Sequence, residues 1–238
     1  MAKFTLDGIV LSKTDYSETS IILKVLTKEE GVKSFIFQGA KRKNKKGNLI
    51  QPLNQLSIEF YQRNDSELAK VSGIEAAIIY KSIPFDPFKS SIVFFINEIL
   101  LNTLKSHDKN EELYDFISQI LQVLDLTETY ANLPIKFLFH YTKLIGFFPN
   151  MVENPRYFDM KNCSFTSTQP QHPNYLSAPL TSTLLSIVNA DFDGKKDPAI
   201  NREMRKSILL ALVNYLHIVL DDFKALKSLP VLETLMED

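Results

Sequence analysis

A short run of basic side chains is the clearest chemical feature of this sequence. Five of the six residues from Lys41 to Lys46 are basic, and Gly39 and Gly47 flank the run; they are Lys41, Arg42, Lys43, Lys45 and Lys46. Positive charge gathered on one short loop neutralises the phosphates of a polynucleotide and releases their condensed counterions. A solvated loop without a ligand has the same composition, so the run alone leaves these two interpretations about equally open.

Aromatic side chains near the same end of the chain could stack on bases. Phe35, Phe37 and Phe60 alternate in phase with other apolar residues, which favours packing in a core. Tyr16 and Tyr61 fall out of that phase and are therefore the candidates for exposed stacking residues. Strand aromatics usually serve the core, and that alternative stays open for both tyrosines.

Catalytic chemistry finds little support in the sequence. Its seven glycines form no phosphate-binding loop, and its single cysteine, Cys163, has no evident activating partner. None of the histidines has an acidic residue or a cysteine nearby at metal-ligand spacing; they are His107, His140, His172 and His217. We therefore expect no enzyme, no cofactor and no metal site. A nuclease, the remote alternative, would need an acidic metal cluster that the sequence does not supply.

The first 80 residues have the period-two alternation of strands. Five runs are separated by turn signals such as Glu29-Glu30-Gly31; they cover residues 4–13, 19–27, 32–38, 55–62 and a weaker stretch from 67 to 74. Five short strands favour a closed barrel because closure removes exposed sheet edges. The expected first domain, residues 1–80, is thus a five-stranded barrel of the OB-fold kind.

Helical periodicity takes over from residue 84. Asp86-Pro87 and Asp197-Pro198 are typical helix starts, in which the acid caps and the proline takes the first position. Further apolar stripes at three- and four-residue spacing cover residues 111–126 and 133–145. The proline-rich stretch 149–178 should be an irregular insertion, with a short hairpin around residues 156–165. We expect an α+β protein, with the barrel packed against a helical domain of residues 81–238.

Bulk composition sets further limits. The first 80 residues carry 12 Lys and Arg against 9 Asp and Glu, whereas the rest carries 15 against 19. No apolar run approaches the roughly 20 residues of a membrane helix, and no signal peptide is visible. A single cysteine permits no intrachain disulfide. These features are typical of a cytoplasmic protein, and a DNA ligand would place it at the nucleoid.

Several stretches, taken in order, resemble the RecO family of DNA repair proteins. Gly8-Ile9-Val10-Leu11 and Asp15-Tyr16-Ser17-Glu18-Thr19-Ser20 resemble its first hairpin, and Gly39-Ala40-Lys41-Arg42 its glycine-then-basic element. Leu226-Lys227-Ser228-Leu229-Pro230 resembles its final segment. These matches lie at both ends, so the resemblance covers essentially the whole chain.

The resemblance implies a recombination mediator that performs no covalent step. Such a protein binds single-stranded DNA, promotes strand annealing and helps to load recombinase. It also implies two protein partners, the acidic C-terminal tail of the single-stranded DNA-binding protein and the RecR mediator. An acidic tail needs an apolar pocket rimmed by cations, and the helical candidates are Lys136, Lys143, Arg202, Arg205 and Lys206.

One departure concerns zinc. Many family members carry a four-cysteine module in the region where this chain has only Cys163 and His172. Two ligands cannot complete a structural zinc site, so we expect a zinc-free branch of the family. The main rival interpretation is a protein-interaction adaptor, with a barrel that binds a peptide or another subunit and a basic run that has no ligand.

Overall fold

The computed structural model describes residues 2–41, 47–62, 68–105 and 109–235. The chain forms two compact units. The first comprises Met1–Phe85 with Ile99–Gln122, and the second comprises Asp86–Glu98 with Val123–Asp238.

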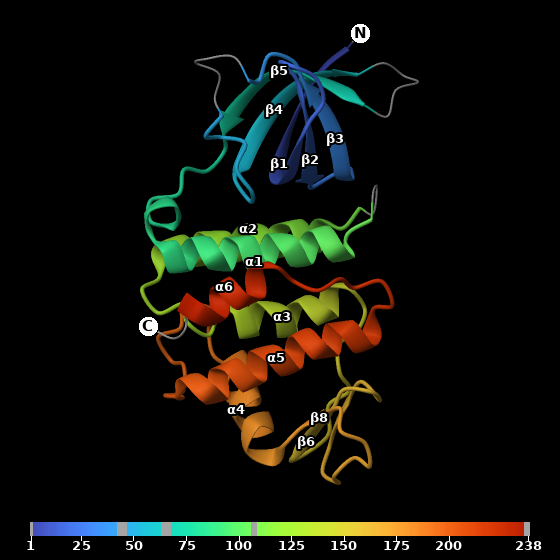
Figure 1. Ribbon diagram of the computed structural model, residues 1–238, viewed down its shortest axis with the longest axis vertical. Coiled ribbons are helices and arrows are strands. Elements are labelled where there is room, and N and C mark those ends of the chain that lie inside the picture. The colour runs from blue at the N-terminus through green and yellow to red at the C-terminus, as the bar shows by residue number, and fades with distance from the viewer. Residues whose placement is uncertain (1, 42–46, 63–67, 106–108, 236–238) are drawn as a thin grey trace. The chain divides into compact units, whose positions relative to one another are not determined.

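The first unit contains a closed barrel of five strands (Figure 1). The strands follow the order β1-β2-β3-β5-β4, in which β3 and β5 pair in parallel and the other neighbours pair antiparallel. Their bounds are β1 Ala2–Asp15, β2 Ile21–Thr27, β3 Gly31–Phe37, β4 Gln55–Gln62 and β5 Ala69–Ala76. The OB-like barrel expected from the alternation is confirmed.

Side chains that alternate inward fill the barrel. Phe35, Phe37 and Phe60 lie in its buried core, as their phase predicted. Gly8 marks a close approach between β1 and β2, because a Cβ there would lie 2.3 Å from the Val25 side chain. A larger residue at this position would force the buried Val25 side chain to move, which gives a physical reason for glycine in the opening motif.

Part of the helical chain belongs to the barrel unit. Helix α1 spans Pro87–Thr103 and helix α2 spans Glu111–Leu126, and the first unit takes the end of α1 and most of α2. The Lys28 ammonium lies 2.7 Å from a carboxylate oxygen of Asp115, and the Ser118 hydroxyl donates to the buried Gln55 amide. These contacts attach α2 to the barrel.

The second unit is a helical body with a small sheet. Besides the start of α1 and the end of α2, it contains α3 Leu133–Leu144, α4 Ala178–Val188, α5 Arg202–Val219 and α6 Ser228–Leu235. The sheet has the order β7-β6-β8, with β6 Tyr157–Asp159, β7 Ser164–Thr166 and β8 Tyr175–Leu176. No helix in the described ranges combines the length and apolar character needed to cross a lipid bilayer.

The two expected helix starts have different outcomes. Asp86 caps α1, since its carboxylate accepts from the backbone N–H groups of Phe88 and Lys89 at 2.9 and 3.1 Å. Asp197 does not cap α5, and that prediction is wrong. Asn201 is the N-cap of α5, and its side chain accepts from the backbone N–H of Met204. The Asp197 carboxylate instead binds the Asn132 amide, just before α3, and the Lys136 ammonium on α3.

The stretch expected to be irregular is more ordered than its composition suggests. Phe158 of β6 stacks on Phe165 of β7 at 4.9 Å and meets Tyr215 of α5 edge-on at 4.9 Å. The turn between the strands is closed by the Asp159 carboxylate, which accepts from the backbone and the side chain of Asn162. Aromatic packing against a helix therefore organises a segment rich in proline and polar residues.

Candidate nucleic-acid interface

The root of the basic run is the one part of it that the structure describes. Lys41 is exposed, and its backbone N–H bonds the Thr19 carbonyl. Its ammonium lies 3.0 Å from both the Ser17 carbonyl oxygen and Asp15 Oδ2. The other four basic candidates, Arg42, Lys43, Lys45 and Lys46, lie outside the described residues. We call residues 41–46 the arm.

Tyr16 lies in the turn that holds the arm root. Its side chain is 59% exposed, and its neighbours Asp15 and Ser17 are the residues that contact Lys41. The turn has internal bonds of its own, from Tyr16 N–H to the Ser20 carbonyl and from Ser20 N–H to the Ser17 hydroxyl. The fold thus brings an exposed aromatic ring and a cation together at one end of β1.

Tyr61 lies near the other end of β1. It is 37% exposed in β4, where it pairs with Lys3 of β1 on one side and Lys70 of β5 on the other. The structure therefore does not join the two candidate tyrosines in one cluster. It supports the out-of-phase, exposed placement that the sequence predicted for both.

Lys33 is a notable barrel residue that the sequence analysis did not single out. Its side chain is 5% exposed, and its ammonium lies 2.6 Å from a Glu30 carboxylate oxygen and 2.7 Å from the Gln62 amide oxygen. The ammonium also lies 4.6 Å from the centroid of the Phe60 ring. The available signal was its phase, because Lys33 alternates inward with the phenylalanines of β3.

Three of the five cations proposed for partner binding have intramolecular partners. Lys136 is 1% exposed and binds the Asp197 carboxylate and the Asp191 carbonyl. The Arg205 Nε–H donates to Asn132, and Lys206 pairs with Glu233 at 2.9 Å. Lys143 and Arg202 are exposed and form no ion pair with any residue that the structure describes. Burial leaves Lys136 no surface to offer a partner.

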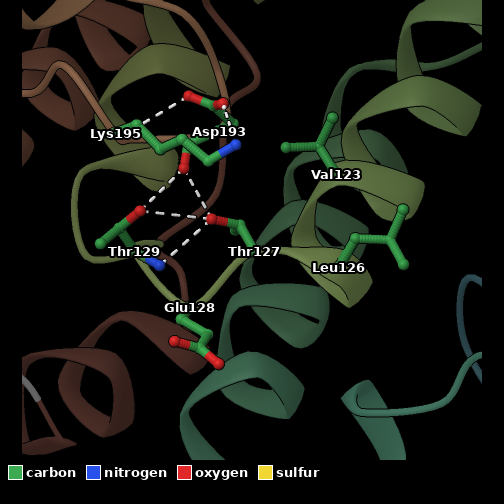
Figure 2. A pocket seen from close by; sticks show the side chains of 7 residues that line it. All are labelled: Val123, Leu126, Thr127, Glu128, Thr129, Asp193 and Lys195. Atoms are coloured by element: carbon green, nitrogen blue, oxygen red, sulfur yellow. Dashed lines mark hydrogen bonds and ion pairs between the residues drawn. The ribbon is translucent and has the colours of Figure 1, made fainter.

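A pocket of about 470 Å³ opens in the second unit (Figure 2). The Thr127 and Thr129 hydroxyls both donate to the Asp193 carbonyl oxygen, at 2.6 and 2.8 Å, and Val123 and Leu126 form the apolar wall. Lys195 at the rim pairs with the Asp193 carboxylate at 3.2 Å. A neighbouring pocket of about 490 Å³ is lined by Arg205, Asn132 and Ile200.

Metal-ligating side chains do not gather in the parts of the chain that are described, where no group of three His, Cys, Asp or Glu could hold an ion. His172 Nε2 lies 3.1 Å from Asp159 Oδ1, at an angle that does not make a hydrogen bond. Burial raises the pKa of Asp159, but the Asn162 hydrogen bonds and His172 outweigh it and hold that pKa below its usual range. The assignment to a zinc-free branch stays a prediction.

Comparisons with known proteins identify the chain's relatives. The family model for the N-terminal part of recombination protein O matches residues 1–80, and the model for its C-terminal part matches residues 84–230. The DNA repair protein RecO of Bacteroides fragilis is 31% identical over 236 residues, which cover 97% of this chain and 98% of the relative. The RecO protein of Flavobacterium psychrophilum is 33% identical over 232 residues, covering 95% and 96%. This chain belongs to the RecO family of DNA repair proteins, which are recombination mediators and not enzymes.

Proposed function

We propose that this chain holds single-stranded DNA on its barrel and so promotes strand annealing and recombinase loading. The observation that carries the proposal is the junction of the Tyr16 turn with the arm root at Lys41. An exposed ring can stack on a base while neighbouring cations bind the flanking phosphates. Bringing complementary strands onto one cationic surface lowers the repulsion between them, so annealing needs no covalent step.

The ion pair between Lys41 and Asp15 does not oppose this role. The Asp15 side chain is 80% exposed, and exposed pairs contribute at most about 1 kcal/mol. A phosphate that approaches Lys41 can therefore replace the carboxylate at small cost. The same contact positions the arm root beside Tyr16 when DNA is absent.

The test is a titration of full-length protein with labelled oligothymidylate over a salt series. Replacing the five arm cations with alanine should weaken binding and reduce the slope of log affinity against log salt by roughly 0.7 for each phosphate contact removed. A matched variant removes five exposed lysines from the second unit, Lys161, Lys195, Lys196, Lys224 and Lys227, and should keep the wild-type slope. Salt-insensitive binding, or equal loss in both variants, contradicts the proposal.

The proposed partners are the acidic tail of the single-stranded DNA-binding protein and RecR, at the nucleoid in the cytoplasm. Arg205 supports the first of these, because it lines the pocket near Ile200 and gives it a cationic side chain. Alanine at Arg202, Arg205 and Lys206 should weaken binding of a tail peptide, whereas alanine at three other exposed lysines, Lys161, Lys224 and Lys227, serves as the matched control. Unchanged affinity in the triple variant would show that these residues do not bind the tail.

The rival is an adaptor whose barrel binds a protein. It predicts no mobility shift of single-stranded DNA at low salt, where electrostatic binding is strongest. The exposed cation and ring at the Tyr16 turn favour the DNA ligand.

A further inference from the structure

Three exposed side chains lie in one row across neighbouring strands of the barrel. Lys3 of β1 pairs with Tyr61 of β4, and Tyr61 pairs with Lys70 of β5. Side chains directly opposite on neighbouring strands have Cβ atoms about 5 Å apart. The row therefore places the side chain of Tyr61 between those of Lys3 and Lys70 on the outer surface of the barrel.

A β-bulge creates this arrangement. Glu59 pairs with Gly73, but Phe60 pairs with Val71, so Ser72 is the extra residue in β5. Without the bulge, Val71 would lie opposite Tyr61. The shift sends Val71 inward beside Phe60 and turns Lys70 outward beside Tyr61, which is how bulges redirect side chains.

The two lysines of the row differ in their partners. The Lys3 ammonium lies 3.0 Å from Glu59 Oε1, and this carboxylate raises the pKa of Lys3. The other oxygen of Glu59 lies 3.0 Å from the position that a Gly73 Cβ would occupy, so the carboxylate extends over Gly73. Lys70 is exposed and forms no ion pair with any residue that the structure describes, so in contrast to Lys3 no described carboxylate holds its ammonium.

Ordinary core packing does not account for Tyr61. The phenylalanines of β3 and β4 fill the interior, whereas the tyrosine ring lies on the opposite face. A partly exposed ring with a polar tip, flanked by cations, matches the alternation of bases and phosphates along a single strand. Protein ligands would not require this alternation.

We propose that Lys3, Tyr61 and Lys70 form a second contact for single-stranded DNA, in which one base stacks on Tyr61 and a neighbouring phosphate binds Lys70. We call these three residues the platform. Glu59 limits the contact by holding Lys3. The platform rests on the proposed function, and it lies at the opposite end of β1 from the Tyr16 turn.

The chain contains no tryptophan, so Tyr61→Trp introduces a single reporter at the platform. Oligothymidylate should quench the emission of this variant, because the stacked base contacts the indole directly, and an abasic oligomer of equal length should quench it far less. Phe94→Trp, at an exposed position of α1, is the matched control and should keep its emission. Undiminished emission from the Tyr61→Trp variant with DNA bound would overturn the platform.

Affinity measurements give an independent test. Tyr61→Ala should weaken oligothymidylate binding roughly tenfold, in the range for one stacked base. Lys70→Ala should reduce the salt slope by roughly 0.7, and Glu59→Gln should strengthen binding at low salt by releasing Lys3. If wild type fails to bind DNA, the proposed function falls. A different outcome would contradict the platform alone. In that case the wild type binds DNA and the arm variant binds more weakly, but the Tyr61, Lys70 and Glu59 variants bind like the wild type.

Discussion

Gly194 shows how one residue can fix the position of a loop. It has φ +73°, and a Cβ there would lie 2.0 Å from the Thr129 carbonyl oxygen. Gly194→Ala should therefore lower the free energy of unfolding by about 3 kcal/mol, from left-handed strain and a backbone clash together. Gly146→Ala is the matched control, because Gly146 has φ +82° but no atom within 4 Å of the added methyl group.

Urea unfolding of the two glycine variants measures the difference. Gly146→Ala should lose only about 1 kcal/mol, the cost of the strained dihedral alone. Equal losses in both variants would mean that the contact with Thr129 contributes nothing.

Single residues also show which features could be predicted from the sequence and which could not. Phe35, Phe60 and the tyrosines were placed correctly, because alternation reports which face of a strand a residue occupies. Lys136 was not expected inside, since its partner Asp197 is remote along the chain and is supplied by the fold. Lys33 was missed although its phase points inward, because a lysine is seldom buried without a partner and the sequence does not show that Glu30 and Gln62 both bind it. The sequence identified Tyr61 but not its two lysine neighbours, because the bulge at Ser72 changes which residue of β5 lies opposite Tyr61.

At the scale of elements, Glu98 of α1 attaches the start of α6. Its carboxylate accepts from the backbone N–H groups of Lys227 and Ser228 at 2.9 and 2.8 Å, and from the Ser228 hydroxyl at 2.6 Å. The Lys-Ser-Leu segment that resembles the family thus has a structural role. This contact could not be predicted from the sequence, because residues 98 and 228 are remote along the chain.

Glu98→Gln should cost about 1–2 kcal/mol at neutral pH, since hydrogen bonds to a charged acceptor are lost. Burial raises the pKa of Glu98, but the three hydrogen bonds outweigh it and hold that pKa below 4.5. A carboxyl group with a depressed pKa stabilises the fold above its unfolded value and loses that effect as the pH falls. The difference between wild type and variant should therefore shrink below pH 4.5, and a constant difference would contradict this role. Glu112→Gln, on exposed α2 surface, is the control.

The small sheet leads to a prediction about metal. Phe158, Phe165 and Tyr215 pack together, and Asp159 closes the turn through Asn162. These contacts should hold β6–β8 without zinc. Elemental analysis should find no stoichiometric zinc in purified protein, and EDTA should leave the melting temperature unchanged. One zinc per chain, with destabilisation by EDTA, would overturn the zinc-free assignment.

At the scale of the molecule, the arm root at Lys41 and the platform lie near opposite ends of β1, so we expect the two contacts to act independently on DNA. Combining the five arm substitutions with Tyr61→Ala should give the sum of the separate losses in log affinity, within about 0.5 kcal/mol. Equilibrium titration with long oligothymidylate measures this sum. If the combined variant loses no more affinity than the arm variant alone, the arm and Tyr61 belong to a single contact with DNA, and the two contacts are not independent.

The parallel pairing of β3 with β5 has a consequence for how the barrel assembles. Among the described residues, two pairs join these strands, Phe35 with Ala69 and Ile36 with Lys70, whereas every other pair of neighbouring strands is longer. Joining them closes a large loop of chain, and the entropy lost in closing it is repaid by few hydrogen bonds. We therefore expect this seam to form late in folding and to open early, and its opening would expose unpaired backbone groups of β3 and β5.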